Sequence, residues 1–80
     1  MAGDKRPTEA LYLHDLATLL KEKALEAASQ RRNSPKDEFA MGRLMGFHEV
    51  ISMMQSLTTG FGLELRDVNL ADINPERDLL

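Results

Sequence analysis

Residues 34–62, SPKDEFAMGRLMGFHEVISMMQSLTTGFG, are predicted to form one long helix with a defined start and a defined stop. Ser34 is a good N-cap, Pro35 suits the first helical position, and Asp37 can reach back toward the Ser34 N–H. Gly60 is predicted to close the helix, because glycine adopts the left-handed conformation that commonly ends helices.

This helix, expected over residues 34–60, carries more apolar surface than one neighbour can cover. At 100° per residue its apolar and small residues occupy about half of the circumference. They are Phe39, Ala40, Leu44, Gly46, Phe47, Val50, Ile51, Met53, Met54 and Leu57. A surface helix needs an apolar stripe of only about 100° to pack against a single partner. The sequence therefore predicts a second partner for this helix.

The composition bounds the class of protein. The chain has 80 residues, so one domain is expected, and a chain this short has difficulty burying a sufficient core alone. It has no cysteine, which excludes disulfides and thiolate metal sites. No signal-peptide pattern or membrane-length apolar run occurs, so a cytoplasmic location is expected. The net charge of −3 argues against a nucleic-acid partner.

A second helix is expected over residues 8–32, after a disordered terminus over residues 1–7. Thr8 is a plausible N-cap. Its apolar arc again covers about half of the circumference. The arc holds Tyr12, Leu13, Leu16, Ala17, Leu19, Leu20, Ala24, Ala27 and Ala28. Lys23 falls inside this arc, where its stem can lie on apolar surface while the ammonium reaches water.

The connection between the two helices, Asn33 to Pro35, is short, so an antiparallel hairpin is expected. The tail, residues 61–80, begins with an alternating pattern that favours extended chain. Asn74 and Pro75 repeat the cap-then-proline start and predict one helical turn. The tail is too apolar to remain in solvent, and it is expected to dock on the hairpin.

Few residues are candidates for chemistry. His48 and Glu49 begin like the zinc-protease motif HExxH, but Ser52 stands where the second histidine is required. His14, beside Asp15, lies on the polar face of the other helix. Solvated histidines are the simpler interpretation, and no catalytic, cofactor or metal residue is assigned. The alternative is a small metal-binding or catalytic bundle that uses His48 and Glu49.

Arg43 projects from the middle of the apolar arc of residues 34–60. A charge there must be paired or must extend to solvent. We expect a buried ion pair, and the candidate partners are Asp15, Glu22 and Glu26.

A basic cluster lies at the turn between the helices, and it consists of Arg31, Arg32 and Lys36. It leaves a nucleic-acid-binding dimer as a second alternative function. Helix-turn-helix readers have shorter helices and a polar recognition face, which this chain lacks.

The segment GRLMGFHEVISMMQSL, residues 42–57, and the ending NPERDLL resemble small bacterial helical-hairpin proteins with no assigned activity. The resemblance implies a helical hairpin and brings no activity and no site residues with it.

These patterns predict an all-α fold: an antiparallel two-helix hairpin with an apolar C-terminal tail, paired as a homodimer in a four-helix bundle. Within the arc of residues 34–60, Phe47 and Ile51 are assigned to the hairpin mate. The dimer interface is assigned to the remaining side of the arc, which holds Phe39, Arg43, Gly46, Val50, Met53 and Leu57. The predicted function is that of a non-catalytic protein-interaction or regulatory protein.

Overall fold

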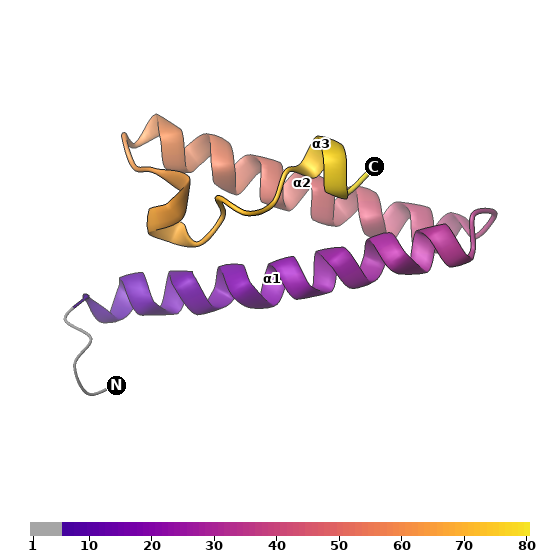
Figure 1. Ribbon diagram of the computed structural model, residues 1–80, viewed down its shortest axis with the longest axis horizontal. Coiled ribbons are helices and arrows are strands. Elements are labelled where there is room, and N and C mark those ends of the chain that lie inside the picture. Colours follow the sequence, from indigo (N-terminus) through magenta and orange to yellow (C-terminus); the bar gives the residue numbers. More distant parts are fainter. Residues whose placement is uncertain (1–5) are drawn as a thin grey trace.

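The computed structural model describes residues 6–80, which form a helical hairpin with a folded-back tail (Figure 1). The elements are α1 (Thr8–Asn33), α2 (Glu38–Gly60), a 3₁₀ helix η1 (Leu65–Val68) and α3 (Pro75–Asp78). Within residues 6–80 every regular element is helical, and α1 packs antiparallel to α2. The predicted all-α class and the pairing of two long helices are confirmed.

The start of α2 differs from the prediction. The N-cap is Asp37, whose Oδ1 accepts hydrogen bonds from the N–H groups of Phe39 and Ala40 at 3.0 and 3.3 Å. The predicted cap, Ser34, instead follows the end of α1 and donates its N–H to the Gln30 carbonyl. Asp37 is as good a cap as Ser34, and placing the start there leaves residues 34–36 to reverse the chain.

At the N-terminal end of α1 the cap is Pro7, which makes no side-chain cap hydrogen bond, and Thr8 is the first helical residue. The assignment of Thr8 as N-cap is therefore wrong by one position. The carbonyl of Pro7 accepts the first bonds of the helix, from the N–H groups of Ala10 and Leu11. Residues 1–5 of the predicted disordered terminus lie outside the described residues.

The end of α2 is set by Gly62 and not by Gly60. Gly62 has φ +77°, whereas Gly60 is the last helical residue. The Gly62 N–H donates to the Thr59 carbonyl and the Leu63 N–H donates to the Thr58 carbonyl. These two bonds make the Schellman motif, which needs its left-handed residue two positions after the last helical residue. From sequence, either Gly60 or Gly62 could have ended the helix. The hydrogen bonds of the closing turn show that Gly62 does so.

Gly62→Ala is expected to destabilise the protein by about 1 kcal/mol, because an alanine at positive φ is strained. Gly60→Ala is the matched control: its φ is not left-handed and nothing lies within 4 Å of an added Cβ. That control should leave stability unchanged or raise it by up to about 1 kcal/mol. Urea unfolding followed by circular dichroism measures both. Equal effects at the two positions would mean that the helix does not end at Gly62.

The hairpin is held by one line of core positions on each helix, spaced alternately by three and four residues. On α1 these core positions are Leu13, Ala17, Leu20, Ala24 and Ala27; on α2 they are Ala40, Leu44, Phe47, Ile51, Met54 and Thr58. This spacing is that of coiled-coil packing. Ala17, Ala24 and Ala27 are fully buried on this line. Figure 1 shows α1 and α2 close together near the turn and diverging toward the open end, where η1 contacts both helices.

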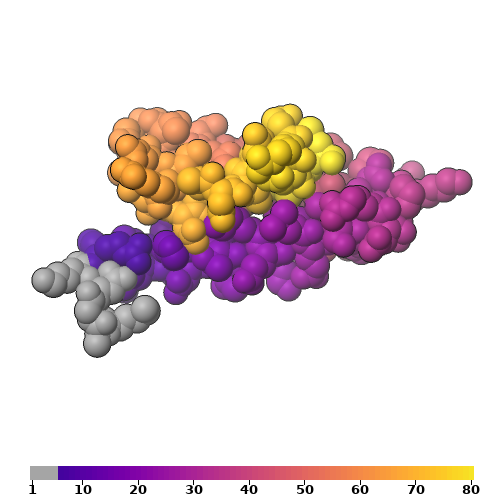
Figure 2. Space-filling model, viewed as in Figure 1, coloured from indigo at the N-terminus to yellow at the C-terminus, as the bar shows by residue number. Residues whose placement is uncertain are grey.

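The tail packs along the hairpin, and its buried side chains are Val68, Leu70, Ile73, Pro75 and Leu79. η1 contacts both long helices and α3 contacts α2. In Figure 2 the tail, orange to yellow, lies across the near side of the hairpin.

Local structure in the tail is partly as predicted. The Asn74 side chain caps α3 and Pro75 stands at its start, as expected. The alternating pattern around Leu63 does not give a strand, because the chain turns at Gly62 and enters η1 at Leu65. A lone extended segment would find no neighbouring strand here to satisfy its backbone groups.

The molecule is elongated. Its radius of gyration is 14.2 Å, and its principal extents are 46 × 28 × 16 Å. A compact 80-residue domain has a radius of gyration of about 12 Å. The molecule is therefore flat and thin, and its two broad sides are formed by a single layer of packed helices.

Candidate interaction surface

Lys21 is the polar residue that joins the tail to α1. Its Nζ donates to Asn69 Oδ1 at 3.0 Å and lies 2.8 Å from Asp72 Oδ1. Asn69 has φ 60° and donates its side-chain amide to Thr18 Oγ1 at 2.6 Å. The Lys21 side chain is only 11% exposed, so these partners compensate the burial of its charge.

Sequence reasoning missed Lys21 and singled out Lys23. The Lys23 side chain is 61% exposed and lies 3.8 Å from Glu26. The helical phase of Lys21 gave no sign of burial, because the groups that bury it, Asn69 and Asp72, come from a tail whose path the sequence leaves open.

Gln55 joins the tail to α2. Its Nε2 donates to the carbonyls of Leu70 and Ile73, at 3.1 and 2.8 Å. His48 Nε2 lies 3.2 Å from Glu76 Oε1, which ties α3 to the same helix. Sequence reasoning considered His48 together with Glu49 only as an alternative function, and it did not foresee the contact of His48 with Glu76 of the tail.

These tail contacts define the two faces of the hairpin. Thr18 and Lys21 of α1, and His48 and Gln55 of α2, each follow a core position by one residue. We call this side the tail face. The residues that precede the core positions by one lie on the opposite side, which we call the free face. These residues are Tyr12, Leu16, Leu19, Lys23 and Glu26 of α1, and Phe39, Arg43, Gly46, Val50, Met53 and Leu57 of α2. Gln30 of α1 is added to the free face because it accepts a hydrogen bond from Arg43.

All the large apolar side chains of the free face except Leu16, which is half-buried, are solvent-exposed. On α2 their exposed fractions run from 36% at Val50 to 73% at Phe39, with Met53 and Leu57 at 56% each. On α1, Tyr12 and Leu19 are 67% and 59% exposed. The residues assigned to the dimer interface from sequence all lie on this face. The tail, which could have covered them, packs on the other side.

An apolar groove of about 220 Å³ extends the free face at the open end of the hairpin. It is lined by Leu13, Met54, Leu57, Thr58, Phe61, Leu63 and Val68. Leu57 belongs to both the groove and the free face, and Phe61 at the rim is 79% exposed. The open end is therefore the most apolar part of the surface on this side.

Arg43 connects the two helices across the free face. Its Nη1 donates to Gln30 Oε1 at 3.0 Å, its Nη2 lies 3.7 Å from Glu26 Oε1, and its guanidinium carbon lies 5.5 Å from the centre of the Phe47 ring. The ion pair with one of the predicted acids, Glu26, is present. The expected burial is wrong, because the Arg43 side chain is 26% exposed and that of Glu26 is 61% exposed. The guanidinium group lies over the face of the Phe47 ring and remains partly exposed to water.

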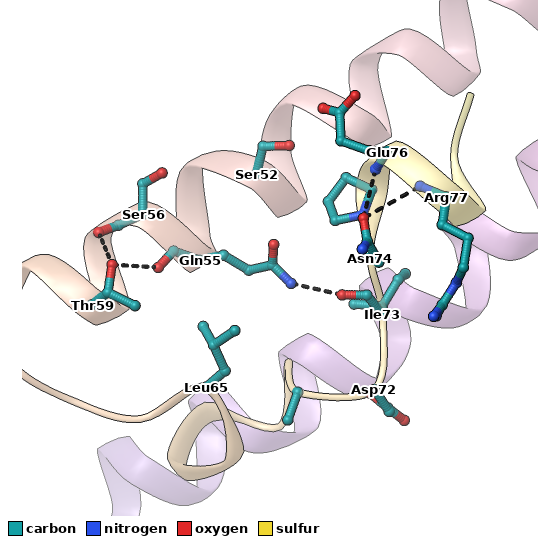
Figure 3. A pocket seen from close by; sticks show the side chains of 12 residues that line it. Ser52, Gln55, Ser56, Thr59, Leu65, Asp72, Ile73, Asn74, Glu76 and Arg77 are labelled. Carbon is teal, nitrogen blue, oxygen red and sulfur yellow. Dashed lines mark hydrogen bonds between the residues drawn. The ribbon is translucent and has the colours of Figure 1, made fainter.

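A polar hollow of about 730 Å³ lies between α2 and the tail (Figure 3). Its charged and amide groups are engaged: Asn74 Oδ1 caps α3, and Arg77 pairs with Asp78. Thr59 bonds back to the carbonyls of Gln55 and Ser56. Among the described residues, no buried side-chain nitrogen or oxygen lacks a hydrogen-bond partner. Within residues 6–80, the hollow therefore contains no buried side-chain nitrogen or oxygen left without a partner that would call for a ligand.

The groups considered for metal binding or catalysis are not assembled. His14 Nδ1 lies 3.7 Å from Asp15, a contact between adjacent residues. Residues 6–80 contain no cluster of three or more His, Asp or Glu side chains arranged to hold a metal ion. In the same range, none of the helices has the length and apolar character needed to cross a membrane.

Two tail carboxyl groups have lowered pKa values. The hydrogen bond from Lys21 lowers the pKa of Asp72 below its ordinary value of 3.8. The hydrogen bond from Arg77, supported by the Asn74 N–H, lowers the pKa of Asp78 to about 2. A carboxyl group whose pKa is lower in the folded state stabilises the fold above its unfolded pKa. That contribution is lost as the pH falls through the folded value.

Asp72→Asn is expected to lower the melting temperature at a pH of about 6 and to have a smaller effect at an acid pH below the lowered pKa of Asp72, where the wild-type carboxyl group is also protonated. Thermal melts of both proteins at the two pH values measure this difference, and the comparison removes the effect of the other carboxyl groups. A difference of the same size at both pH values would show that the Lys21–Asp72 contact does not stabilise the tail.

The free face, rather than the hollow or the histidines, is the candidate functional surface of residues 6–80. Comparison of the chain with protein families, with curated proteins and with solved structures gives no match.

Proposed function

We propose that this chain is a non-catalytic interaction protein that works as a homodimer, with the free faces of two hairpins forming a four-helix bundle. The observation that carries the proposal is the exposure of Val50, Met53 and Leu57 beside Tyr12 and Leu19. Contiguous apolar patches of more than a few hundred Å² are uncommon on soluble monomers and mark interaction sites. A two-fold axis would bury both copies of the face in one self-complementary interface.

The single chain has a small hydrophobic core, which supports the proposal that a second hairpin packs against it. Within residues 6–80, the large side chains with less than 2% exposure are Ile51, Leu70 and Leu79. Much of the contact between α1 and α2 is made by alanines, which bury little apolar area each. Chains of this size commonly gain stability by association. Pairing two free faces would enclose further leucine, methionine and aromatic surface.

The free face of α2 also has the periodicity of a helix seam. From Phe39 to Leu57 its residues advance alternately by four and three positions, as the core positions do. Such spacing keeps a continuous stripe facing a partner helix over several turns. α2 thus carries two neighbouring seams, of which α1 occupies one.

Light scattering after size exclusion, over about 1 to 100 μM protein, tests the proposal. The expected mass at the upper concentrations is twice the 9.0 kDa of the chain. A mass of 9.0 kDa over the whole range would overturn it.

A further inference from the structure

We infer that the two hairpins of the dimer pair with their turns at the same end, so that α1 of each copy lies over α2 of the other. This inference rests on the proposed dimer and adds the arrangement of the second copy. It follows from a change of polarity along the free face.

On α1 the free face is apolar toward the open end and polar toward the turn. Tyr12, Leu16 and Leu19 come first along the helix, followed by Lys23, Glu26 and Gln30. On α2 the order is mirrored because the helices are antiparallel: the apolar residues Val50, Met53 and Leu57 lie toward the open end, and Arg43 and Gly46 lie toward the turn. Phe39, which is 73% exposed, is the apolar exception at the turn end of this face.

The contacts of Arg43 show which residues of α1 and α2 stand at the same height along the hairpin. Its contacts with Glu26 and Gln30 place these residues opposite one another. Counting outward from that level, Val50 stands at the same height along the hairpin as Leu19, and Leu57 at the same height as Tyr12, while the two helices diverge toward the open end (Figure 1). The apolar halves of the two helices therefore coincide at the open end, and the polar halves coincide near the turn.

Two hairpins can stack face to face about a two-fold axis that runs either along the hairpin or across it. With the axis along the hairpin, apolar half meets apolar half: Val50 lies over the partner's Leu19, and Leu57 lies over the partner's Tyr12. Arg43 then lies over the partner's Glu26. This arrangement adds a charge-complementary contact on each side of the axis.

With the axis across the hairpin, each helix lies over its own copy in the reverse direction. Leu57 then faces the partner's Arg43, and Tyr12 faces the partner's Glu26. This arrangement would cover the exposed Phe39 with the partner's open end. It would also press two arginines and two glutamates against apolar side chains, and charges removed from water without new partners oppose association. The polarity of the face therefore favours the first arrangement.

Distances between spin labels distinguish the arrangements. The chain has no cysteine, so Ser34→Cys at the turn and Thr8→Cys at the open end each give one labelled site per subunit. Both residues are exposed. α1 has 26 residues and is about 39 Å long. Pulsed electron paramagnetic resonance measures the distance between the two labels of a dimer.

With turns together, both labelled proteins should give distances below about 30 Å. With the axis across the hairpin, Tyr12 faces the partner's Glu26, so the two Thr8→Cys labels should lie about 35 Å apart and the two Ser34→Cys labels about 45 Å apart. If only the open halves overlap, the Thr8→Cys pair is close and the Ser34→Cys pair lies beyond about 40 Å.

Light scattering on the same labelled samples tests the proposed dimer separately from the arrangement of its two hairpins. A dimer mass with both distances short supports the inference. A dimer mass with either distance long overturns the inference and leaves the proposed dimer standing. A monomer mass in both labelled proteins, with the wild type also monomeric, overturns both. Unchanged melting temperatures are the control that the labels leave the fold intact.

Discussion

Leu70→Ala is expected to lower the free energy of unfolding by about 3 kcal/mol, within the range of about 2–5 kcal/mol found for large-to-small core substitutions. Leu70 is fully buried, and it is among the largest side chains enclosed by the fold. Its own carbonyl is fixed by Gln55, and the neighbouring Asn69 is fixed to α1. The site therefore cannot collapse easily, and the cavity left by the substitution should remain.

Leu80→Ala is the matched control, since Leu80 belongs to the same tail and is 76% exposed. That substitution should change stability by less than about 0.5 kcal/mol. Urea unfolding by circular dichroism compares the two. If Leu70→Ala does not fold, Leu70→Met, which conserves volume and should cost less than about 1.5 kcal/mol, provides the measurable variant. A Leu70→Ala protein as stable as Leu80→Ala would mean that the tail does not pack on the hairpin.

The long helices and the short turn of the tail could be predicted because their signals are local. Apolar spacing over many turns identifies α1 and α2, and it also identifies the two seams of α2. The pair Asn74–Pro75 combines a capping side chain with a residue that suits only the first turn. Each of these signals acts between residues a few positions apart, so it can be read from the sequence alone.

Helix ends were harder to place because equivalent residues compete for each role. Ser34 and Asp37 can both cap a helix, and the reversal of the chain decides between them. Gly60 and Gly62 can both adopt positive φ, and the hydrogen bonds of the closing turn select Gly62. In such cases the sequence shows which residues could cap or end a helix, and the backbone geometry shows which of them does.

The individual contacts that join the tail to the long helices could not be predicted. The burial of Lys21 depends on Asn69 and Asp72, about fifty residues away. The prediction that Arg43 is buried was wrong for a related reason. Helical phase places Arg43 within the apolar arc, but its guanidinium group lies over the Phe47 ring and remains partly exposed. The free face itself needed only helical phase, which explains why its residues were found from sequence.

Met53→Glu is expected to raise the dissociation constant of the proposed dimer by at least about 100-fold, or about 2.7 kcal/mol. Met53 lies on the free face between Val50 and Leu57, and two-fold symmetry would place two of the new carboxylates in one interface. Each would lose water without gaining a partner. The fold of the single chain should persist, because Met53 is 56% exposed there.

Met45→Glu is the control for the chemistry of the substitution. Met45 stands on the same helix, is 60% exposed, and follows the core position Leu44, so it belongs to the tail face. Light scattering over about 1 to 100 μM protein should give a dimer for wild type and Met45→Glu, and a monomer for Met53→Glu. Circular dichroism should show all three to be helical at low temperature. If Met45→Glu dissociated a wild-type dimer and Met53→Glu did not, the tail face would be the interface and the assignment of the free face would be wrong.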